Sequence, residues 1–267
     1  IMFGIVEKQG KHRNPITGSG GMLIGTVEKV GDNYEGILKP GDKLATLVSL
    51  SLTPLVIEEI LEIRPDVDQV DIKGKAILFQ SGIFAVLPDD MPENLALSVL
   101  DVAGAPAQTA RLVQSGDTVV IIGAGGKSGM LCLYEAKKRA GVNGKVIAIT
   151  NSERSTKRAE SLGIADIVKS VNSTDAVAMY NFISEVTDGK MADVVINCVN
   201  IENTEMASIL ACKDRGTVYF FSMATSFTKA ALGAEGVGKD INMMVGNGYC
   251  KDHAAVSLQV LRDSEII

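Results

Sequence analysis

This sequence has little histidine, and it lacks closely paired cysteines and long apolar runs. Its 267 residues contain two histidines, His12 and His253, and four cysteines, none of them at Cys-x-x-Cys spacing. A zinc site built from closely spaced cysteine and histidine is therefore excluded, although a site assembled from distant residues is not. No apolar run approaches the roughly 18 residues of a membrane helix, and no secretory signal pattern opens the chain.

The charge balance excludes a second group of partners. The formal net charge is −6, with 46% hydrophobic and 22% charged residues, which is typical of a globular protein. An acidic chain disfavours nucleic acid or an anionic membrane surface as the main partner. Four scattered thiols indicate a reducing compartment. We therefore expect a cytoplasmic protein that binds small molecules, with no nucleic-acid or membrane partner.

The most informative stretch is residues 118–129, which reads TVVIIGAGGKSG. Its first five residues are typical of a strand buried on both faces, and residues 130–139 predict a helix. A glycine turn between a strand and a helix N-terminus makes an anion site, because backbone N–H groups and the helix dipole favour a phosphate there.

Two phosphate-binding motifs compete for this turn. Residues 126–128 match the end of a P-loop, but its first glycine would fall on Ile121, inside the predicted strand. Residues 124–129 fit the dinucleotide motif G-x-G-x-x-G with alanine in first place, whereas residues 123–128 fit it with serine in last place. An ordinary turn without a ligand is the third interpretation. We favour the dinucleotide, because the pattern of the chain after the turn supports it.

Strands and helices alternate from residue 117 onward. The predicted strands are 118–122, 145–150, 166–171, 193–199, 216–222 and 241–245, and the predicted helices are 130–139, 153–162, 176–186, one that ends at 211 and one that starts at 252. This alternation predicts an α/β fold with a doubly wound parallel sheet of the Rossmann type, in the strand order 3-2-1-4-5-6.

Residues 1–110 lack this alternation and predict a partial β-rich module, which we expect to be truncated at its start. The predicted elements are a helix-like opening, strands 22–30 and 43–50, a helix over 55–63, a hairpin of strands 76–80 and 83–87, and a helix over 95–112 interrupted at 104–106. We assign 1–110 to a catalytic or substrate module and 111–267 to a dinucleotide-binding domain.

The second strand of the alternating half bears on the cofactor. An NAD site usually has Asp or Glu about 20 residues after the glycine turn, where it holds the ribose 2′-OH. Here Thr150, Asn151 and Ser152 stand in that place, with Arg154 behind them. A neutral pocket beside a guanidinium suits a 2′-phosphate, although charges there often belong to a solvated helix face. We expect NADP or NAD as cofactor, with NADP accepted well.

Polar residues also follow the fourth and fifth predicted strands, where ligands bind in such sheets. Lys127 is expected to support the pyrophosphate, or else to point to solvent. The predicted cofactor site consists of Gly123, Ala124, Gly125, Gly126, Lys127, Ser128, Gly129, Thr150, Asn151, Ser152, Arg154, Cys198, Val199, Asn200, Ser222 and Met223.

These features together resemble the medium-chain dehydrogenase/reductase superfamily, which joins a GroES-like β-rich module to a Rossmann domain. The strings at 25–31 (GTVEKVG), 39–42 (KPGD) and 123–129 match its pattern. Longer strings at 14–25, 100–110, 123–130, 192–200 and 219–233 are similar to a zinc-free branch, the L-erythro-3,5-diaminohexanoate dehydrogenases.

The resemblance implies NAD(P)-dependent oxidative deamination of a small diamino acid at C3. The products would be 5-amino-3-oxohexanoate and ammonia, in anaerobic lysine fermentation. We also expect a homo-oligomer, either a dimer or a tetramer. A zinc-free quinone or enoyl reductase of the same superfamily, and a non-catalytic dinucleotide-binding module, remain alternatives.

The resemblance also suggests substrate residues. Where zinc-dependent relatives carry a histidine–glutamate pair, this chain reads TGSGG at 17–21, so no metal is expected. An amine lone pair can drive hydride loss once the ammonium is deprotonated. Asp101 lies near the position of a catalytic ligand in zinc-dependent relatives and is the candidate base, with a helix cap as the alternative. Thr17 and Ser19 are candidate substrate contacts, unless they simply form a turn.

Overall fold

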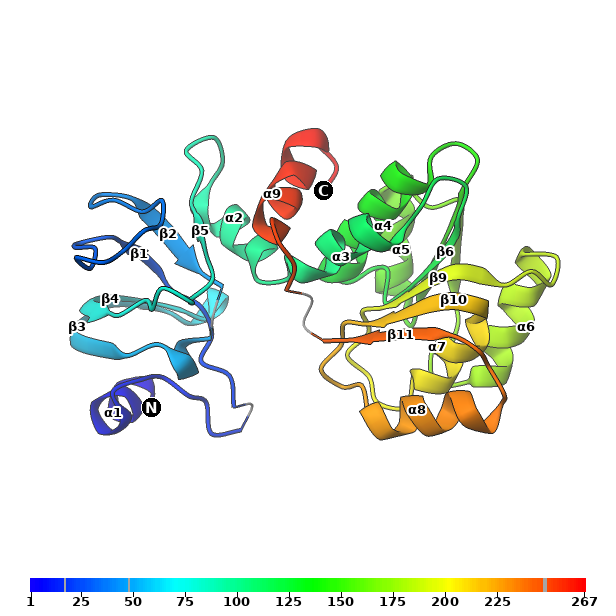
Figure 1. Ribbon diagram of the computed structural model, residues 1–267, viewed down its shortest axis with the longest axis horizontal. Helices are drawn as coiled ribbons and strands as arrows, with labels where there is room; N and C mark the ends of the chain where they lie inside the picture. Colours follow the sequence, from blue (N-terminus) through cyan, green and yellow to red (C-terminus); the bar gives the residue numbers. More distant parts are fainter. Residues whose placement is uncertain (17, 48, 247–248) are drawn as a thin grey trace. The chain divides into compact units, whose positions relative to one another are not determined.

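The computed structural model describes residues 1–16, 18–47, 49–246 and 249–267 (Figure 1). They form two compact units, Ile1–Asp101 and Val102–Ile267. Helix α3 (Gly104–Leu112) packs against helices α4 (Lys127–Ala140) and α9 (His253–Asp263), and so belongs to the second unit. The observed division therefore lies earlier than the boundary expected between residues 110 and 111. The roles expected of the two units remain predictions.

The second unit is built on a six-stranded parallel sheet in the order β11-β10-β9-β6-β7-β8. Counted along the chain, this is the predicted order 3-2-1-4-5-6, which is confirmed. The strands are β6 (Thr118–Ile122), β7 (Lys145–Thr150), β8 (Ile167–Ser170), β9 (Ala192–Asn197), β10 (Cys212–Phe220) and β11 (Asn242–Val245).

Helices cover both faces of this sheet. One apolar cluster joins it to α3, α4 (Lys127–Ala140) and α5 (Glu153–Ser161), and the other joins it to α6 (Ala176–Val186), α7 (Glu205–Ala211) and α8 (Phe227–Gly236). Helix α9 (His253–Asp263) packs on α3 and α4.

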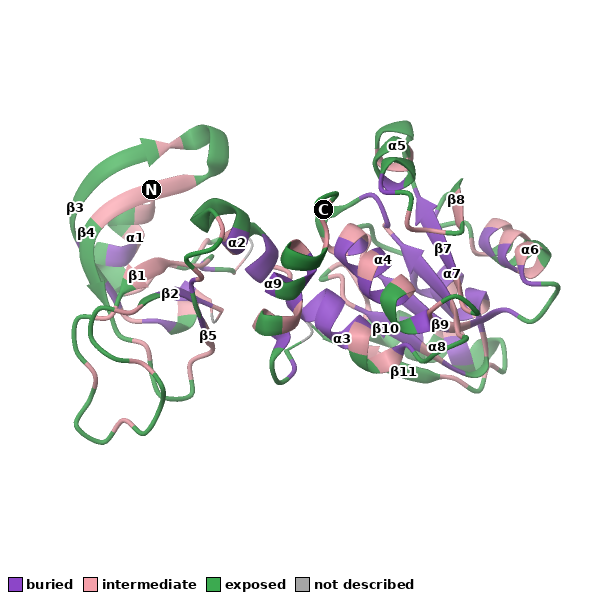
Figure 2. Ribbon diagram, turned by 90° about the horizontal axis from the view of Figure 1, so that it is seen from above, coloured by how far each residue is buried: buried purple, intermediate pink, exposed green. Residues whose placement is uncertain are grey.

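The central strand β6 explains why this arrangement could be predicted. Val119 and Ile121 pack in one cluster, and Val120 and Ile122 pack in the other. A strand covered on both faces reads as a continuous apolar run rather than an alternating one. Figure 2 shows strands of this sheet in the colour of buried residues.

The first unit contains two small antiparallel sheets. β1 (Ile24–Thr26), β2 (Lys43–Thr46) and β5 (Phe84–Val86) form one, and β3 (Leu55–Arg64) and β4 (Gln69–Ala76) form a two-stranded ribbon. α1 (Met2–Gln9) packs on β3, and α2 (Glu93–Leu100) ends the unit. Two short 3-10 helices lie at Leu50–Leu52 and Pro65–Val67.

The helix predicted over residues 55–63 is wrong, because this segment is strand β3. Its apolar residues recur at helical spacing, but several of them, such as Ile57 and Ile60, are β-branched and favour an extended backbone. The pairing with β4 decides between the two structures, and that partner cannot be recognised from β3 alone.

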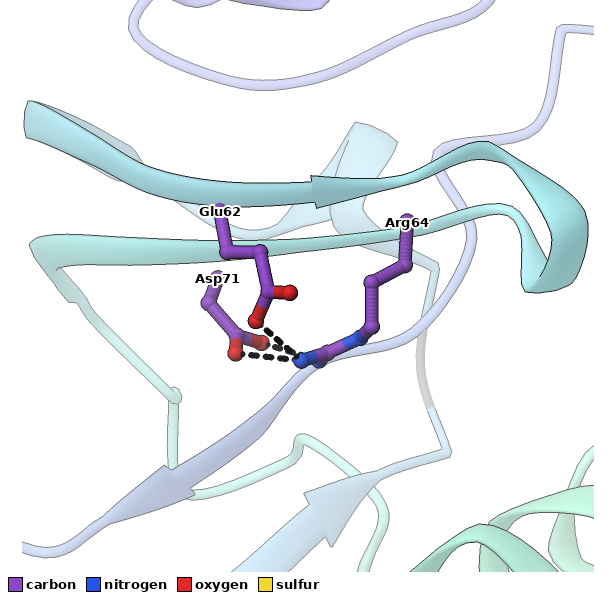
Figure 3. A network of polar contacts seen from close by, with 3 residues as sticks. All are labelled: Glu62, Arg64 and Asp71. Carbon is purple, nitrogen blue, oxygen red and sulfur yellow. Dashed lines mark hydrogen bonds and ion pairs between the residues drawn. The ribbon is translucent and has the colours of Figure 1, made fainter.

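The far end of the ribbon carries a small network of charges (Figure 3). Arg64 donates to Asp71 at 2.7 Å on the opposite strand and to Glu62 at 2.9 Å on its own strand. All three side chains are more than one third exposed, so the network stabilises the ribbon only modestly.

The predicted hairpin at residues 76–87 is also wrong. The turn exists, because Gly82 donates to the carbonyl of Phe79 at 2.7 Å. Its two flanks, however, join different sheets: Ala76 ends β4, which pairs with β3, whereas β5 pairs with β2.

Three further boundaries differ from the predictions. The strands expected over 22–30 and 43–50 are limited to β1 and β2, and Val48 lies outside the described residues. The break expected at 104–106 lies just before those residues, between α2 and α3. Pro106 fits in the first turn of α3, where a missing N–H removes no intrahelical bond. None of the helices in the described ranges is long and apolar enough to span a membrane.

A carboxylate before β8 connects α4 with β7. Asp166 accepts a bond from Lys137 Nζ at 2.6 Å and another from the Val146 N–H at 2.7 Å. Burial raises the pKa of Asp166, but the bonds to Lys137 and Val146 outweigh burial and hold the pKa below its ordinary 3.8. A lowered pKa means that the ionised carboxylate stabilises the fold above this value, and that the contribution is lost as the pH falls below it.

We therefore expect Asp166→Asn to lower the melting temperature near neutral pH by about 2–4 °C, the shift that 1 kcal/mol produces in a domain of this size. The difference from wild type should shrink as the pH approaches about 3. Calorimetry across this range measures it, with Glu160→Gln on the exposed face of α5 as the control. A difference that is constant with pH would show that the charge of Asp166 contributes nothing.

Candidate functional site

The glycine turn connects β6 to α4 at the carboxyl edge of the parallel sheet. The N–H groups of Gly123 and Ala124 both donate to the carbonyl of Ile149, at 2.9 and 3.0 Å, which holds the turn against β7. Gly126 precedes the first residue of α4 and supplies no side-chain cap. N–H groups in the first turn of a helix have no intrahelical acceptor, so this end of α4 can receive an anion.

The glycines of this turn have different steric roles. Gly123 has a φ of +85°, and a Cβ there would lie 2.8 Å from the backbone N of Val199. A Cβ at Gly129 would lie 2.2 Å from the carbonyl O of Gly123, so α4 packs directly on the turn. A Cβ at Gly126 would meet, among described atoms within 4 Å, just that carbonyl, at 3.3 Å. The second glycine thus leaves room for close approach, and the third permits tight packing, as a dinucleotide turn requires.

The structure does not support the competing P-loop. Ile121 lies inside β6 and is fully buried. A P-loop would need a free, flexible backbone at that position. Gly125 is also packed against protein, because a Cβ there would lie 2.2 Å from the carbonyl O of Ser155 in α5.

The polar residues after β7 are bonded within the protein. Thr150 is fully buried, and its Oγ1 lies 2.6 Å from the hydroxyl of Thr156. Ser152 caps α5 by accepting a backbone N–H of its first turn at 3.3 Å. The side chain of Asn151 lies within hydrogen-bond distance of Ser173. These side chains shape the connection between β7 and α5, and their direct contact with a cofactor remains a prediction.

Arg154 is different, because it is exposed on the first turn of α5. Together with Lys157 and Arg158 it lines an open depression on the outer face of this helix. Lys157 is 2.6 Å from Glu153, so the two arginines provide the remaining positive charge of the depression. This surface can bind a phosphate group. It is equally consistent with the alternative interpretation, in which these charges belong to a solvated helix face.

The loop after β9 lies beside the glycine turn, because β9 neighbours β6 in the sheet, and the loop after β10 follows next along the same edge. The N–H of Cys198 donates to the carbonyl of Ile122 at 2.8 Å. Ser222 Oγ lies 3.5 Å from Asn200 Oδ1, which links the two loops. Met223 is 87% exposed. The structure therefore brings these predicted cofactor residues together at one edge of the sheet.

The thiol of Cys198 points into the protein. Its Sγ lies 3.8 Å from Sγ of Cys132 on α4. The hydrogen bond with Cys132, together with burial, raises the pKa of Cys198 well above its ordinary value. A neutral, buried thiol is a packing group rather than a nucleophile. The cofactor contact expected of Cys198 remains a prediction.

Asn197, the last residue of β9, is not among the predicted cofactor residues. Its side chain is fully buried and bonds to Thr204 and Ser208 near the start of α7. The sequence does indicate a buried polar contact here, since an amide at the end of an apolar strand needs buried hydrogen-bond partners. The identity of those partners could not be read from the strand.

The candidate substrate residues belong to the first unit. Asp101 follows the last residue of α2 with an exposed side chain, and its N–H donates to the carbonyl of Leu97 at 3.0 Å. Asp101 is thus the C-terminal cap residue of α2, as its alternative supposed, and its catalytic role remains a prediction. Ser19 accepts the N–H of Gly21 on its hydroxyl at 3.2 Å, and Thr17 lies outside the described residues. In the described part of the chain, no cluster of three or more His, Cys, Asp and Glu residues could hold a metal ion.

Two family models match the chain. Residues 1–88 match the L-erythro-3,5-diaminohexanoate dehydrogenase N-terminal domain. Residues 129–238 match the zinc-binding dehydrogenase family.

Solved structures at low sequence identity share the fold. A mycobacterial protein solved in complex with NADPH is 18% identical, with a TM-score of 0.68, over 93% of this chain and 72% of that one. The alcohol dehydrogenase of Thermus sp. ATN1 is 17% identical, with a TM-score of 0.62, over 99% of this chain and 80% of that one. The fold is thus the predicted Rossmann domain with an antiparallel β-rich region before it.

Two relatives share most of the sequence, and both are named L-erythro-3,5-diaminohexanoate dehydrogenase. The protein of Acetoanaerobium sticklandii is 61% identical, and the alignment covers 98% of this chain and 77% of the relative. The protein of Fusobacterium nucleatum subsp. nucleatum is 60% identical with the same coverage. This identity spans both units, and the chain belongs to the L-erythro-3,5-diaminohexanoate dehydrogenase family.

Proposed function

We propose that this chain catalyses the NAD(P)-dependent oxidative deamination of L-erythro-3,5-diaminohexanoate at C3, to 5-amino-3-oxohexanoate and ammonia. The observation that carries the proposal is 61% identity to a dehydrogenase of that name along 98% of the chain. Low-identity neighbours support the fold alone, so nothing on this chain favours a quinone or enoyl substrate.

The residues of the second unit fit a dinucleotide. The open side of Gly126 and the uncapped start of α4 provide a cradle that a Cβ would begin to fill. Backbone N–H groups there would hold the pyrophosphate, with Lys127 supporting it. Arg154 would meet the ribose of the adenine half, including a 2′-phosphate where NADP is used. When bound, the cofactor supplies a hydride acceptor for C3 of the substrate.

The first unit supplies the substrate groups. A diamino acid carries two ammonium groups at neutral pH, and the one at C3 must lose a proton before a hydride can leave. Asp101 pairs with an ammonium group and accepts this proton, and Ser19 and Thr17 bind the substrate. Water then adds to the substrate imine, and ammonia leaves. This route needs no Lewis acid, which accords with the TGSGG sequence at residues 17–21.

The direct test is absorbance at the nicotinamide band while the purified protein is mixed with L-erythro-3,5-diaminohexanoate and NAD⁺ or NADP⁺. We expect substrate-dependent reduction with release of ammonia. Cofactor binding without turnover would leave a dinucleotide-binding module, and turnover with a quinone or an enoyl thioester alone would point to the reductase alternative. Light scattering during purification tests the expected dimer or tetramer.

A first variant tests the glycine turn. Gly126→Val should raise the cofactor dissociation constant by at least about tenfold, because the side chain fills the space that the pyrophosphate needs. The melting temperature should change little. Gly129→Ala is the matched control: its Cβ would lie 2.2 Å from a backbone carbonyl, so it should instead destabilise the fold. Unchanged affinity in folded Gly126→Val would contradict the assignment.

A second variant tests cofactor choice. Arg154→Glu should lower kcat/KM for NADP relative to NAD by at least about tenfold, since the new carboxylate repels a 2′-phosphate. Arg158→Glu makes the same change in charge one helical turn further along α5 and should shift the ratio by less than about threefold. Equal shifts of the kcat/KM ratio in both variants would mean that the total charge of α5 matters rather than Arg154. No shift in Arg154→Glu would refute the placement of Arg154 beside the 2′-phosphate.

A third variant tests the base. Asp101→Asn should lower kcat/KM by at least about a hundredfold while cofactor binding and folding persist, because it removes both an ion pair and a proton acceptor. Asp89→Asn, at another exposed aspartate of the same unit, should have little effect. A loss smaller than about threefold would reduce Asp101 to a surface residue.

The metal-free route is tested with a chelator. A strong chelator should leave the rate unchanged, because no step of the proposed route uses a metal ion. Loss of activity on chelation, with recovery on adding zinc, would contradict it.

A further inference from the structure

The buried amide of Asn197 is the centre of a polar cluster at the carboxyl end of β9. Its Nδ2 donates to Thr204 Oγ1 at 2.8 Å and to Ser208 Oγ at 2.9 Å, and its Oδ1 accepts the Val199 N–H at 3.1 Å. Asn197 and Ser208 are fully buried, and Thr204 is 2% exposed. A dry site of this kind makes each bond difficult to replace.

The direction of each bond follows from its partner. The Val199 N–H can only donate, so the amide oxygen must face it. The Ser208 hydroxyl donates to the Thr204 carbonyl at 2.9 Å and therefore accepts from the amide. An asparagine satisfies this set because it offers one acceptor and two donors on a flat group, which neither aspartate nor leucine can do.

The cluster holds the loop that lies against the glycine turn. Its bond to Val199 fixes the peptide that a Cβ at Gly123 would approach within 2.8 Å. On the preceding residue, the Cys198 N–H is bonded to the end of β6 at 2.8 Å. The backbone of this loop is thus placed from two sides, by β6 and by α7.

The same end of α7 also holds the loop after β10. Glu205 is 3% exposed, and its Oε1 accepts the Ser226 N–H at 2.6 Å. Thr204, the N-cap of α7, and Glu205, its first residue, therefore fix the loops that follow two neighbouring strands. Both loops lie on the β9–β11 half of the sheet, beyond the glycine turn.

We infer that Asn197 is a positioning residue for the nicotinamide half of the cofactor. The inference rests on the proposed function. In a doubly wound sheet a dinucleotide lies across the switch point, with one nucleotide on each half. Arg154 and the end of β7 belong to the first half, which leaves the β9 and β10 loops for the nicotinamide. Asn197 acts through these loops, since its own side chain has no exposed surface.

The experiment compares the cofactor with an analogue that lacks the nicotinamide. We would measure by calorimetry the dissociation constants of NADP⁺ and 2′-phospho-ADP-ribose, and of NAD⁺ and ADP-ribose. For Asn197→Leu we expect affinity for the full cofactor to fall about tenfold, and affinity for the analogue to stay within about twofold. A purely structural role would not separate the two ligands.

Two further variants guard against a folding defect. Ser208→Ala removes one acceptor from the amide. It should raise the ratio of the dissociation constant of the full cofactor to that of the analogue by about threefold, in the same direction as Asn197→Leu. Thr187→Val is the matched control, at the C-cap of α6 before β9 begins. Thr187 is 6% exposed, and its hydroxyl bonds to Ile183 at 2.6 Å and Met191 at 3.0 Å. It should lose stability and leave the ratio unchanged.

The outcomes are distinct. Equal weakening of cofactor and analogue, or no weakening of either, in folded Asn197→Leu or Ser208→Ala overturns the inference while the proposed function stands. A changed ratio of the two dissociation constants in Thr187→Val also overturns the inference, because the loss of any buried hydrogen bond would then produce the effect. If the wild-type protein binds none of the four ligands, the proposed function fails, and the inference fails with it.

Discussion

The contact between α4 and the carbonyl of Gly123 constrains the whole edge of the parallel sheet. A Cβ at Gly129 would lie 2.2 Å from this oxygen, and a Cβ at Gly123 would lie 2.8 Å from the backbone of the β9 loop. A strand end, a helix start and a neighbouring loop thus meet without side chains between them. Such packing has little room to adjust, so the anion site at the start of α4 and the loop beyond it keep a fixed spacing.

Buried polar groups extend this constraint away from the turn. Asn197 and Glu205 replace the water that loop peptides would otherwise need, and they bind those peptides to the start of α7. Apolar residues of similar size would bury as much surface without specifying where each N–H points. The polar cluster therefore fixes the positions of the loop peptides, but each of its buried polar groups needs a hydrogen-bond partner. Such a cluster is expected beside a functional site rather than in an ordinary apolar core.

The sequence predicts well what local patterns determine. The six strands of the second unit were found within a few residues, because burial on both faces leaves an unbroken apolar run such as 118–122. The glycine turn was found from its spacing. Strand β3 was misread because its pairing with β4 outweighs its helical spacing. Asn197 was left out of the predicted site for a related reason: its partners are 7 and 11 residues away, at the N-cap of α7 and within α7, and the spacing within β9 gives no sign of them.

The polar residues after β7 show a finer limit of sequence reasoning. Thr150 and Ser152 occupy the place of a ribose-binding carboxylate, yet the structure uses their hydroxyls to join β7 to α5. A charge at Thr150 would be buried beside Thr156 and would disturb the fold before it affected a cofactor. Arg154, in contrast, is exposed on the first turn of α5. Arg154 takes part in no buried contact described for this helix, whereas the loops after β9 and β10 are bonded to the start of α7 and cannot move independently of it.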